Sequence, residues 1–436
     1  MVWANLASKR GSCRLLVDRM ERLAPFFLAK LMMKIDSDAK NYQSNMANEN
    51  LSKAKIAKND EFYTQYADIQ KEINAYLEYN PDVFRGKTIL LPCDDPEWSN
   101  FTKFFAQNFE NFGLKKLIST SYAVESKQIK QWQPTLFETE NPNYDADKSR
   151  TNGKIFILDH DTNQNGKIDI EDLEWQYLNG DGDFRSDEVK KLRDEADIII
   201  TNPPFSLFRE FLAWIVEAEK EFVIIGNMNA ITYKEVFPLI KDNKMWLGNG
   251  FNAGNAYFRL IGDTSKYANG VFNDETGLVK FRNCCWFTNL DHGRRHQSLS
   301  LMTMEDNIKF SKHKEVKGVG YQKYDNYDAI EVPFTDAIPS DYDGAMGVPI
   351  SFLDKYCPEQ FEIITMTKTP IGNNYRTKIY NRQIQHNADN TTQSVTKAND
   401  GAVIVIKEPL INKPYYEIDG ILLSAVYPRI LIRKKQ

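Results

Sequence analysis

Apolar and polar positions alternate between strand-like and helix-like spacing from about residue 59 to about residue 290. Short apolar runs predict strands at Lys87–Leu91, Lys116–Thr120, Lys154–Leu158, Asp197–Thr201 and Phe222–Gly226, and a late strand, expected at an antiparallel edge, at Cys284–Thr288. Apolar residues spaced three and four apart predict helices at Ala67–Tyr79, Asn100–Asn111 and Ser206–Glu221. This alternation predicts a Rossmann-like α/β fold with a mostly parallel sheet.

The stretch from Asp197 to Phe205 carries the sharpest chemical signal. Its three consecutive isoleucines are typical of a strand buried on both faces. The strand stops at Asn202, Pro203, Pro204 and Phe205, where the prolines fix φ and donate no backbone hydrogen bond. Such a stiff turn, at the carboxyl end of a buried strand, lies where open α/β sheets place ligands. Its amide oxygen, carbonyl groups and aromatic face suit a planar amino group; the alternative is a proline turn without chemistry.

Composition narrows the class of protein. The chain has 436 residues, of which 42% are hydrophobic, enough for two or three packed domains. The sequence contains no run of 18 apolar residues without a charge, so we expect no transmembrane helix. Five cysteines without a CxxC pair predict a reducing compartment, the cytoplasm, and no cysteine-type zinc site.

Three regions follow from these patterns. Residues 1–45 combine an apolar, basic stretch with a polar segment, and Met46 resembles a natural start, so we interpret residues 1–45 as an extension that is dispensable or not native. Residues 46–290 form the predicted α/β domain, with an insert at 159–175. Residues 291–436 are irregular and rich in Tyr, Asn, Lys and Pro, and we expect them to pack partly on the α/β domain.

The net charge of −5 hides an uneven distribution. Residues 157–188 contain ten acids and two bases, whereas residues 294–323 contain seven bases and three acids. Residues 367–382 contain four bases and no acid, and the tail adds four more bases. One basic cluster is ordinarily a solvated face, but three in the last third favour a surface for double-stranded DNA. The side-chain types that read base edges give these candidate contacts: Asn373, Asn374, Arg376, Arg382 and Gln383.

Three further strings stand at the ends of predicted elements. Residues 60–65 (DEFYTQ) precede the first helix, where Thr64 is either a helix N-cap or part of a binding site. Asp94 and Asp95 follow the first strand and are either turn residues or acceptors for a polar ligand. Residues 180–184 (GDGDF) are either a plain turn or a binding loop.

Residues 161–172 fit an EF-hand-type calcium loop with glycine at the sharp turn. Position twelve is aspartate, which is shorter than the usual glutamate and predicts weaker binding. We expect either a structural calcium ion or an empty polar loop. The expected ligands are Asp161, Asn163, Asn165, the carbonyl of Lys167, and Asp172.

Taken together, these strings resemble the EcoRI-type adenine-specific DNA methyltransferases over roughly residues 52–436. The turn at 202–205 is similar to motif IV, DEFYT at 60–64 to motif X, and GDGDF to motif III. CDDP at 93–96 stands where motif I carries glycines, and this degenerate form is a mark of the group. Further matching segments are Ile224–Glu235, Tyr342–Pro349 and Arg429–Arg433.

The resemblance implies S-adenosyl-L-methionine as cofactor and adenine N6 in duplex DNA as the methylated group. In motif IV, the asparagine oxygen and the first proline carbonyl accept hydrogen bonds from the target amino group, and we assign base stacking to Phe205. The base must leave the duplex to reach this turn. The implied cofactor contacts are Phe62, Tyr63 and Thr64 for the methionine end, Asp94 or Asp95 for the ammonium or ribose, and Asp183 and Phe184 for the adenine.

The resemblance also implies a partner restriction endonuclease that acts on the same site without a stable complex, and we expect a monomer. Two other classes stay open. A glutamine-N5 protein methyltransferase also uses Asn-Pro-Pro before an aromatic residue, but normally has a glycine-rich motif I and no long basic C-terminal region. A non-catalytic DNA-binding or calcium-binding protein would not need the string at 60–65.

Overall fold

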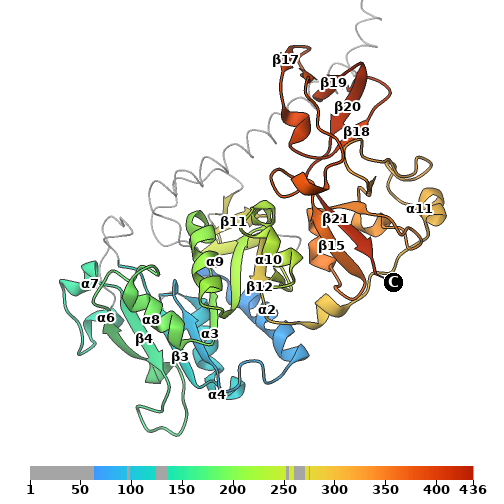
Figure 1. Cartoon of the computed structure of the whole chain (residues 1–436). Coiled ribbons are helices and arrows are strands. Elements are labelled where there is room, and N and C mark those ends of the chain that lie inside the picture. Colours follow the sequence, from blue (N-terminus) through green and yellow to red (C-terminus); the bar gives the residue numbers. More distant parts are fainter. Residues whose placement is uncertain are drawn as a thin grey trace, which may run out of the picture. The chain divides into compact units, whose positions relative to one another are not determined.

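The computed structural model describes residues 63–95, 99–123, 136–251, 255–259, 271–273 and 275–435 (Figure 1). The expected extension, residues 1–45, lies outside these ranges, and so does Phe62. Within the described ranges, no helix is long and apolar enough to cross a membrane. Four cysteines there are free: Cys93, Cys284, Cys285 and Cys357.

An eight-stranded sheet organises the first half of the described chain. Its strands run in the order β5, β4, β3, β2, β6, β7, β12, β8. β3, β2, β6 and β7 are parallel neighbours, whereas β4, β5, β12 and β8 pair antiparallel. The strand bounds are β2 Thr88–Leu91, β3 Lys116–Thr120, β4 Lys154–Leu158, β5 Glu174–Tyr177, β6 Ile198–Thr201, β7 Glu221–Asn227, β8 Trp246–Leu247 and β12 Cys284–Thr288.

The sheet is therefore mixed, and the prediction of a mostly parallel sheet holds only for its four central strands. Parallel neighbours need a crossover, usually a helix. β4 pairs antiparallel with β3, and the described helices before it, α6 Leu136–Thr139 and α7 Lys148–Thr151, are short. β4 then pairs with β5, and the acidic segment that contains η1 Ile170–Asp172 connects the two strands. β12 is antiparallel as predicted, but β8 pairs with its outer side.

Helices beside the sheet follow the predicted apolar spacing. α9 Phe208–Glu217 buries Phe208, Phe211, Leu212 and Ile215, the stripe expected from the sequence. The predicted helix begins at Ser206, but in the structure that residue lies in a 3₁₀ turn, η2 Phe205–Leu207. The predicted helix at 100–111 is broken at Asn108. The helix bounds are α2 Tyr66–Tyr79, α3 Asn100–Gln107, α4 Phe109–Phe112, α8 Asp187–Glu195, η3 Met228–Thr232 and α10 Phe237–Lys241.

A small sheet stands beside the carboxyl end of β6. Its strand order is β1, β9, β11, β10, and all its pairings are antiparallel. The bounds are β1 Tyr63–Thr64, β9 Asn255–Arg259, β10 Phe272–Asn273 and β11 Leu278–Arg282. This sheet joins the start of the described chain to the segment before β12.

Residues after 290 form two more sheets (Figure 1). One has the order β13, β14, β21, β15, and the other β17, β16, β19, β20, β18. Strand bounds are β13 Ile330–Glu331, β14 Met346–Pro349, β15 Phe361–Met366, β16 Ile384–His386, β17 Thr392–Ser394, β18 Val403–Val405, β19 Tyr415–Ile418, β20 Ile421–Ala425 and β21 Arg429–Lys434. Helical segments are η5 Gly293–His296, α11 Met304–Phe310, η6 Thr335–Ala337, η7 Ile350–Lys355, η8 Asn373–Tyr375 and η9 Lys397–Asn399.

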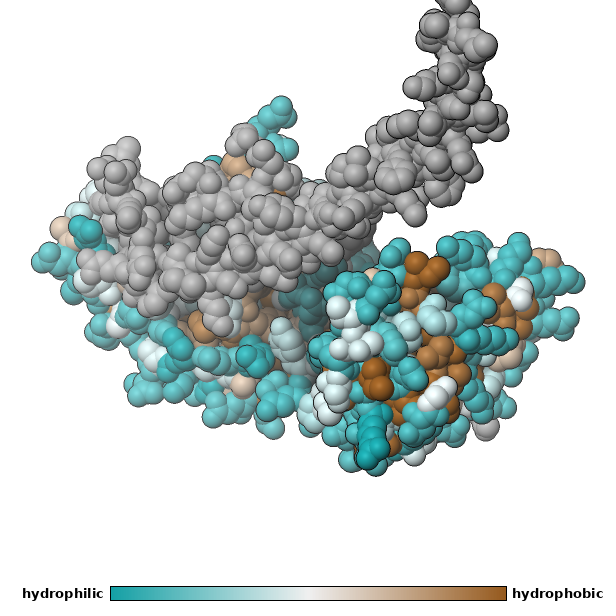
Figure 2. All heavy atoms as spheres, turned by 90° about the horizontal axis from the view of Figure 1, so that it is seen from above, coloured by the Kyte–Doolittle hydropathy of each residue, from teal (hydrophilic) through white to brown (hydrophobic). Residues whose placement is uncertain are grey.

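One hydrophobic cluster runs from the eight-stranded sheet into the sheet that contains β21. It includes Leu90 and Ile224 of the first sheet and Val348, Phe361 and Ile430 of the second, each nearly or wholly buried. Figure 2 shows hydrophobic residues between hydrophilic ones on one face of the molecule. The apolar side chains of this cluster lie inside, and burial of that kind is the main favourable term in folding.

Gly226 of β7 is tightly enclosed. A Cβ at this position would lie 2.5 Å from a ring carbon of Phe208 and 2.9 Å from one of Phe287. We therefore expect Gly226→Ala to lower the free energy of unfolding by about 1–3 kcal/mol, measured by denaturant unfolding. Gly180→Ala is the control, because the nearest atom to its Cβ would be 3.8 Å away. Equal stability of the two variants would contradict this packing.

Candidate active site

The turn at 202–205 lies at the carboxyl end of β6, in the middle of the parallel strands. Pro203 is buried, while Asn202, Pro204 and Phe205 are partly buried. The backbone N–H of Leu207 donates to the carbonyl of Pro204 at 2.9 Å, which starts η2 and then α9. The sequence prediction of a stiff turn between a buried strand and an amphipathic helix is confirmed.

The buried carboxylate of Asp94 ties this turn to the end of β2. Its two oxygens accept hydrogen bonds from Ser99 Oγ and Thr201 Oγ1, both at 2.6 Å. Ser99 Oγ also accepts the N–H of Phe101 and caps α3. Asp94 is 4% exposed, so these charge-assisted bonds lie away from water. Asp94 therefore fixes the ends of β2, β6 and α3 relative to one another.

The sequence missed this scaffold role of Asp94. The cofactor contact implied for Asp94 or Asp95 stays a prediction. Asp95 is partly exposed, and its carbonyl accepts the N–H of Ser99 at 2.6 Å. Both acids lie at the carboxyl edge of the parallel strands, where the prediction put them.

Thr64 is a strand residue, and the helix N-cap alternative is wrong. α2 has Gln65 as its N-cap, without a side-chain hydrogen bond. Thr64 is 2% exposed, its carbonyl accepts a bond from Asn100 Nδ2 at 2.7 Å, and its Oγ1 has no hydrogen-bond partner among the described residues. A buried hydroxyl without a partner is costly, so this one suits a polar ligand. Tyr63 precedes it in β1.

An aromatic cluster brings Thr64 close to the turn. The ring of Phe205 makes edge-to-face contacts with Phe258, at 6.1 Å between centroids, and with Phe281, at 5.8 Å. Phe258 is also the cross-strand partner of Thr64 in β1 and β9. Phe258 thus connects Thr64 of the motif X string with Phe205 of the motif IV turn, although the two strings are far apart in sequence. Sequence reasoning missed Phe258 and Phe281, although the alternation at 255–259 is a strand signal.

A buried glutamate on α2 holds the loop that leads into β9. Glu72 is 1% exposed and accepts hydrogen bonds from Tyr76 Oη at 2.6 Å and from the N–H groups of Asn249 and Gly250 at 2.9 and 3.1 Å. Burial raises the pKa of the Glu72 carboxyl, although these bonds oppose the rise. The sequence signal for this role is an acid within the apolar stripe of α2, because Glu72 is buried beside Ile69 and Ile73.

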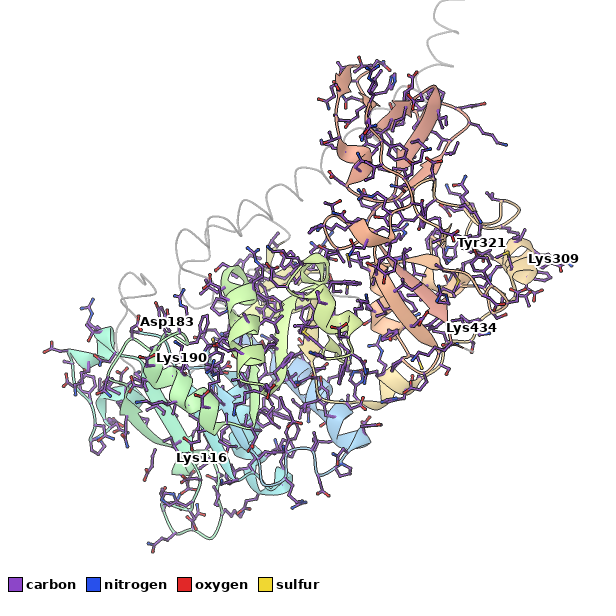
Figure 3. The ribbon with its side chains drawn as sticks, in the orientation of Figure 1. Lys116, Asp183, Lys190, Lys309, Tyr321 and Lys434 are labelled. Atoms are coloured by element: carbon purple, nitrogen blue, oxygen red, sulfur yellow. The ribbon has the colours of Figure 1, made fainter. Side chains whose placement is uncertain are left out.

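Asp183 and Phe184 occupy different surroundings. Asp183, labelled in Figure 3, is paired with Arg185 at 2.6 Å. Phe184 is 5% exposed and packs edge-to-face on Phe211 and Trp214. That burial favours a core role for Phe184 over the adenine stacking implied by the resemblance. The loop still lies beside the carboxyl end of β3, because the carbonyl of Asp181 accepts the N–H of Ala123 at 2.8 Å.

Hydrogen bonds within the loop hold residues 161–172, the expected calcium loop. Its expected ligand oxygens accept hydrogen bonds from the loop itself: Asp161 from Asn165 and Gly166, Asn163 from Asn165, and Asn165 from Lys167. Asp172 accepts from Thr162, Asn163 and Asp169, and with Asp169 it makes a capping box around η1. Within the described ranges no cluster of acids, histidines or cysteines suits a metal. The structure therefore gives the expected calcium ion no support.

The expected DNA contacts divide into exposed and engaged side chains. Asn374 and Arg382 are exposed. Asn373 is exposed as well, whereas Arg376 is partly buried and donates to Thr369 Oγ1 at 3.0 Å. Gln383 is a correction: it is 2% exposed, its amide donates to the carbonyl of Tyr380 and its oxygen accepts the N–H of Ala398. It holds the backbone of its own region.

A groove of about 640 Å³ lies between α10 and the segment that contains η8. Lys241 of α10 places its Nζ 5.5 Å from the ring centroid of Tyr375. Lys368 reaches from the same segment to Thr232 Oγ1 at 2.8 Å. The lining includes Lys234, Phe237, Lys241, Ile371, Asn374 and Tyr375. Lysines beside an aromatic ring and an amide give this groove the chemistry of a nucleic-acid contact.

Comparison with known proteins decides the family. The family model described as "Adenine-specific methyltransferase EcoRI" matches residues 50–435. The chain belongs to this family. The EcoRI-type resemblance drawn from the motifs is thereby confirmed, and the chain is an adenine-specific DNA methyltransferase.

Relatives of this EcoRI-type methyltransferase include three type II methyltransferases. M.EcoRI of Escherichia coli is 43% identical over 326 residues, which are 74% of this chain and 91% of that protein. M.MpnI of Mycoplasma pneumoniae is 34% identical over 73% of this chain and 86% of its own length. M.MgeORF184P of Mycoplasma genitalium is 33% identical over the same shares. No solved structure matches the chain.

The unsatisfied hydroxyl of Thr64 gives a test of the cofactor site. Thr64→Val keeps the shape and removes the hydroxyl, so we expect equal or higher stability and about fivefold weaker binding of S-adenosyl-L-methionine, since a hydrogen bond is worth about 1 kcal/mol. Calorimetric titration and thermal unfolding measure both quantities. Thr102→Val is the control, because Thr102 Oγ1 bonds Ser119 Oγ at 2.9 Å; it should lose stability and keep cofactor affinity. Unchanged affinity in Thr64→Val would remove Thr64 from the site.

The loop at 161–172 should be stable without calcium. Asp172→Ala leaves the N–H groups of Thr162, Asn163 and Asp169 without their acceptor, so we expect it to lower the free energy of unfolding by about 1–3 kcal/mol, equally in calcium and in chelator. Glu171→Ala is the control, because Glu171 is exposed. Millimolar calcium that raises the melting temperature of the unaltered protein, and not of Asp172→Ala, would show that the loop binds the ion and contradict this prediction.

Proposed function

We propose that this EcoRI-type methyltransferase moves a methyl group from S-adenosyl-L-methionine to N6 of an adenine flipped out of duplex DNA, at one short sequence. The observation that carries the proposal is the meeting of three strings at one edge: the turn at 202–205, the buried hydroxyl of Thr64, and Asp94. Asp94 bonds the residue before Asn202, and Phe258 contacts both Phe205 and β1.

The residues on the cofactor side fit the methionine end of the cofactor. The hydroxyl of Thr64 would hold it, together with backbone N–H groups at the start of α2, where the helix dipole favours a carboxylate. Asp94 or Asp95 would accept its ammonium or ribose hydroxyls. When bound, S-adenosyl-L-methionine supplies an electrophilic methyl group.

The residues on the base side would hold and activate the adenine amino group. Asn202 Oδ1 and the carbonyl of Pro203 would accept its two N–H bonds, and this geometry turns the nitrogen lone pair out of conjugation. The ring of Phe205, fixed by Phe258 and Phe281, would stack on the base. Flipping costs a few kcal/mol, which stacking and edge hydrogen bonds offset.

The type II names of the relatives support a place in a restriction–modification system. We propose a monomer that acts in the cytoplasm beside an endonuclease for the same DNA site, without a stable complex between them. Residues 291–436 would read the DNA sequence, with the groove at Asn374 and Tyr375 as one contact. The class of glutamine-N5 protein methyltransferases would instead place the methyl group on protein.

Transfer of labelled methyl groups to duplex DNA tests the proposal. Asn202→Ala should lower the transfer rate by about 10²–10³ while cofactor affinity is kept, because one preorganised acceptor is lost at the reacting group. Digestion of the DNA to nucleosides should show label in N6-methyladenine. Asn74→Ala, an exposed change in α2, is the control with normal activity. Label on protein, or an unchanged rate in Asn202→Ala, would overturn the proposal.

A further inference from the structure

The neighbouring antiparallel strands β9 and β11 have one apolar and one basic face. Because successive side chains of a strand point to opposite faces, Phe258 and Phe281 turn to Phe205 and the residues between them turn away. Lys280 is the cross-strand partner of Tyr257, and Arg259 and Arg282 continue the same side. The outer side chains Tyr257, Arg259, Lys280 and Arg282 are here called the hairpin face, after the paired strands β10 and β11 that β9 flanks.

The bases of the hairpin face carry uncompensated charge. Arg259 and Arg282 are exposed, Lys280 is partly exposed, and in the described residues none of the three has a carboxylate partner. β9 and β11 contain no acid. The ring of Tyr257 is 42% exposed, with Lys280 Nζ at 5.6 Å from its centroid. Three positive charges and an exposed tyrosine on two neighbouring strands are therefore available to an anionic partner.

The basic clusters after residue 290 are different, because many of their charges are paired inside the protein. Arg294 pairs with Asp354, Lys378 with Asp325, Arg429 with Glu331 and Arg433 with Glu362. Lys368 and Lys434 donate to Thr232 and to the carbonyl of Ser340. The sequence analysis therefore counted charges in these clusters that the structure shows to be paired, and it did not identify the hairpin face.

We infer that the hairpin face binds phosphates of the DNA strand beside the target adenine. The inference rests on the proposed function, since it needs the base at Phe205. Phe258 and Phe281 of these two strands contact Phe205, so the bases are carried by the strands that flank the proposed site of the adenine. Arginine forks match phosphate geometry, and tyrosine hydroxyls commonly bond the DNA backbone. Such contacts position the duplex and do not read its sequence.

The salt dependence of DNA binding tests the hairpin face. Each phosphate contact contributes about 0.9 to the slope of log K against log salt. The full chain with R259Q and R282Q should therefore show a slope shallower by about 1.8, with equal weakening on cognate and unrelated duplexes. The pair R259K and R282K, which keeps both charges, should keep a slope near that of the unaltered protein.

The matched control removes two lysines elsewhere. Lys115 lies at the amino end of β3, away from the carboxyl ends of the parallel strands, and Lys191 lies on α8. Both side chains are exposed. K115Q with K191Q should leave the slope unchanged, and the methyl-donor affinity and melting temperature of all variants should stay normal. An unchanged slope in R259Q/R282Q, or an equal drop in the control, overturns the inference.

The two proposals fail in different ways. If the unaltered protein transfers no methyl group to adenine in any duplex, the proposed function fails. If it methylates adenine and R259Q/R282Q binds DNA with the original slope, only the hairpin inference fails. At saturating DNA the double variant should keep its turnover rate, because the loss is in binding and not at the reacting group.

Discussion

The candidate active site depends on the buried carboxylate of Asp94. Its bonds to Ser99 and Thr201 join the end of β2, the start of α3 and the end of β6, three segments that the chain brings together only by folding. Hydrogen bonds to a buried charge are worth about 1.5–3 kcal/mol each, and more is lost when one partner is removed. Phe205 and Phe258 then connect this edge to the small sheet that carries Thr64. The turn at 202–205 and the strand that contains Thr64 owe their relative position to these two contacts.

Local patterns predicted what is local. The strands at 116–120, 154–158 and 284–288 have the expected bounds, because runs of apolar residues between polar turns leave little choice. The turn at 202–205 followed from proline geometry alone. The directions of β4 and β5 and the break at Asn108 did not follow, because pairing partners and helix ends depend on contacts between distant residues.

The partners of charged groups were the least predictable feature. Composition placed DNA contacts in the last third of the chain, where Arg429 and Arg433 in fact pair with Glu331 and Glu362. Residues 161–172 match the calcium-loop pattern, and their side-chain oxygens accept hydrogen bonds from N–H groups of the same loop. Conversely, Arg259 and Arg282 gave no cluster in the sequence, since it is the register of β9 and β11 that places them on one face.

Photo-cross-linking with methyl-labelled S-adenosyl-L-methionine, followed by mapping of the labelled peptides, tests most directly whether these segments form one site. The account predicts label in the peptides that contain Tyr63–Thr64, Asp94–Asp95 or Asn202–Phe205, and strong competition by S-adenosylhomocysteine. Label confined to residues 291–436, or spread without competition, would contradict it.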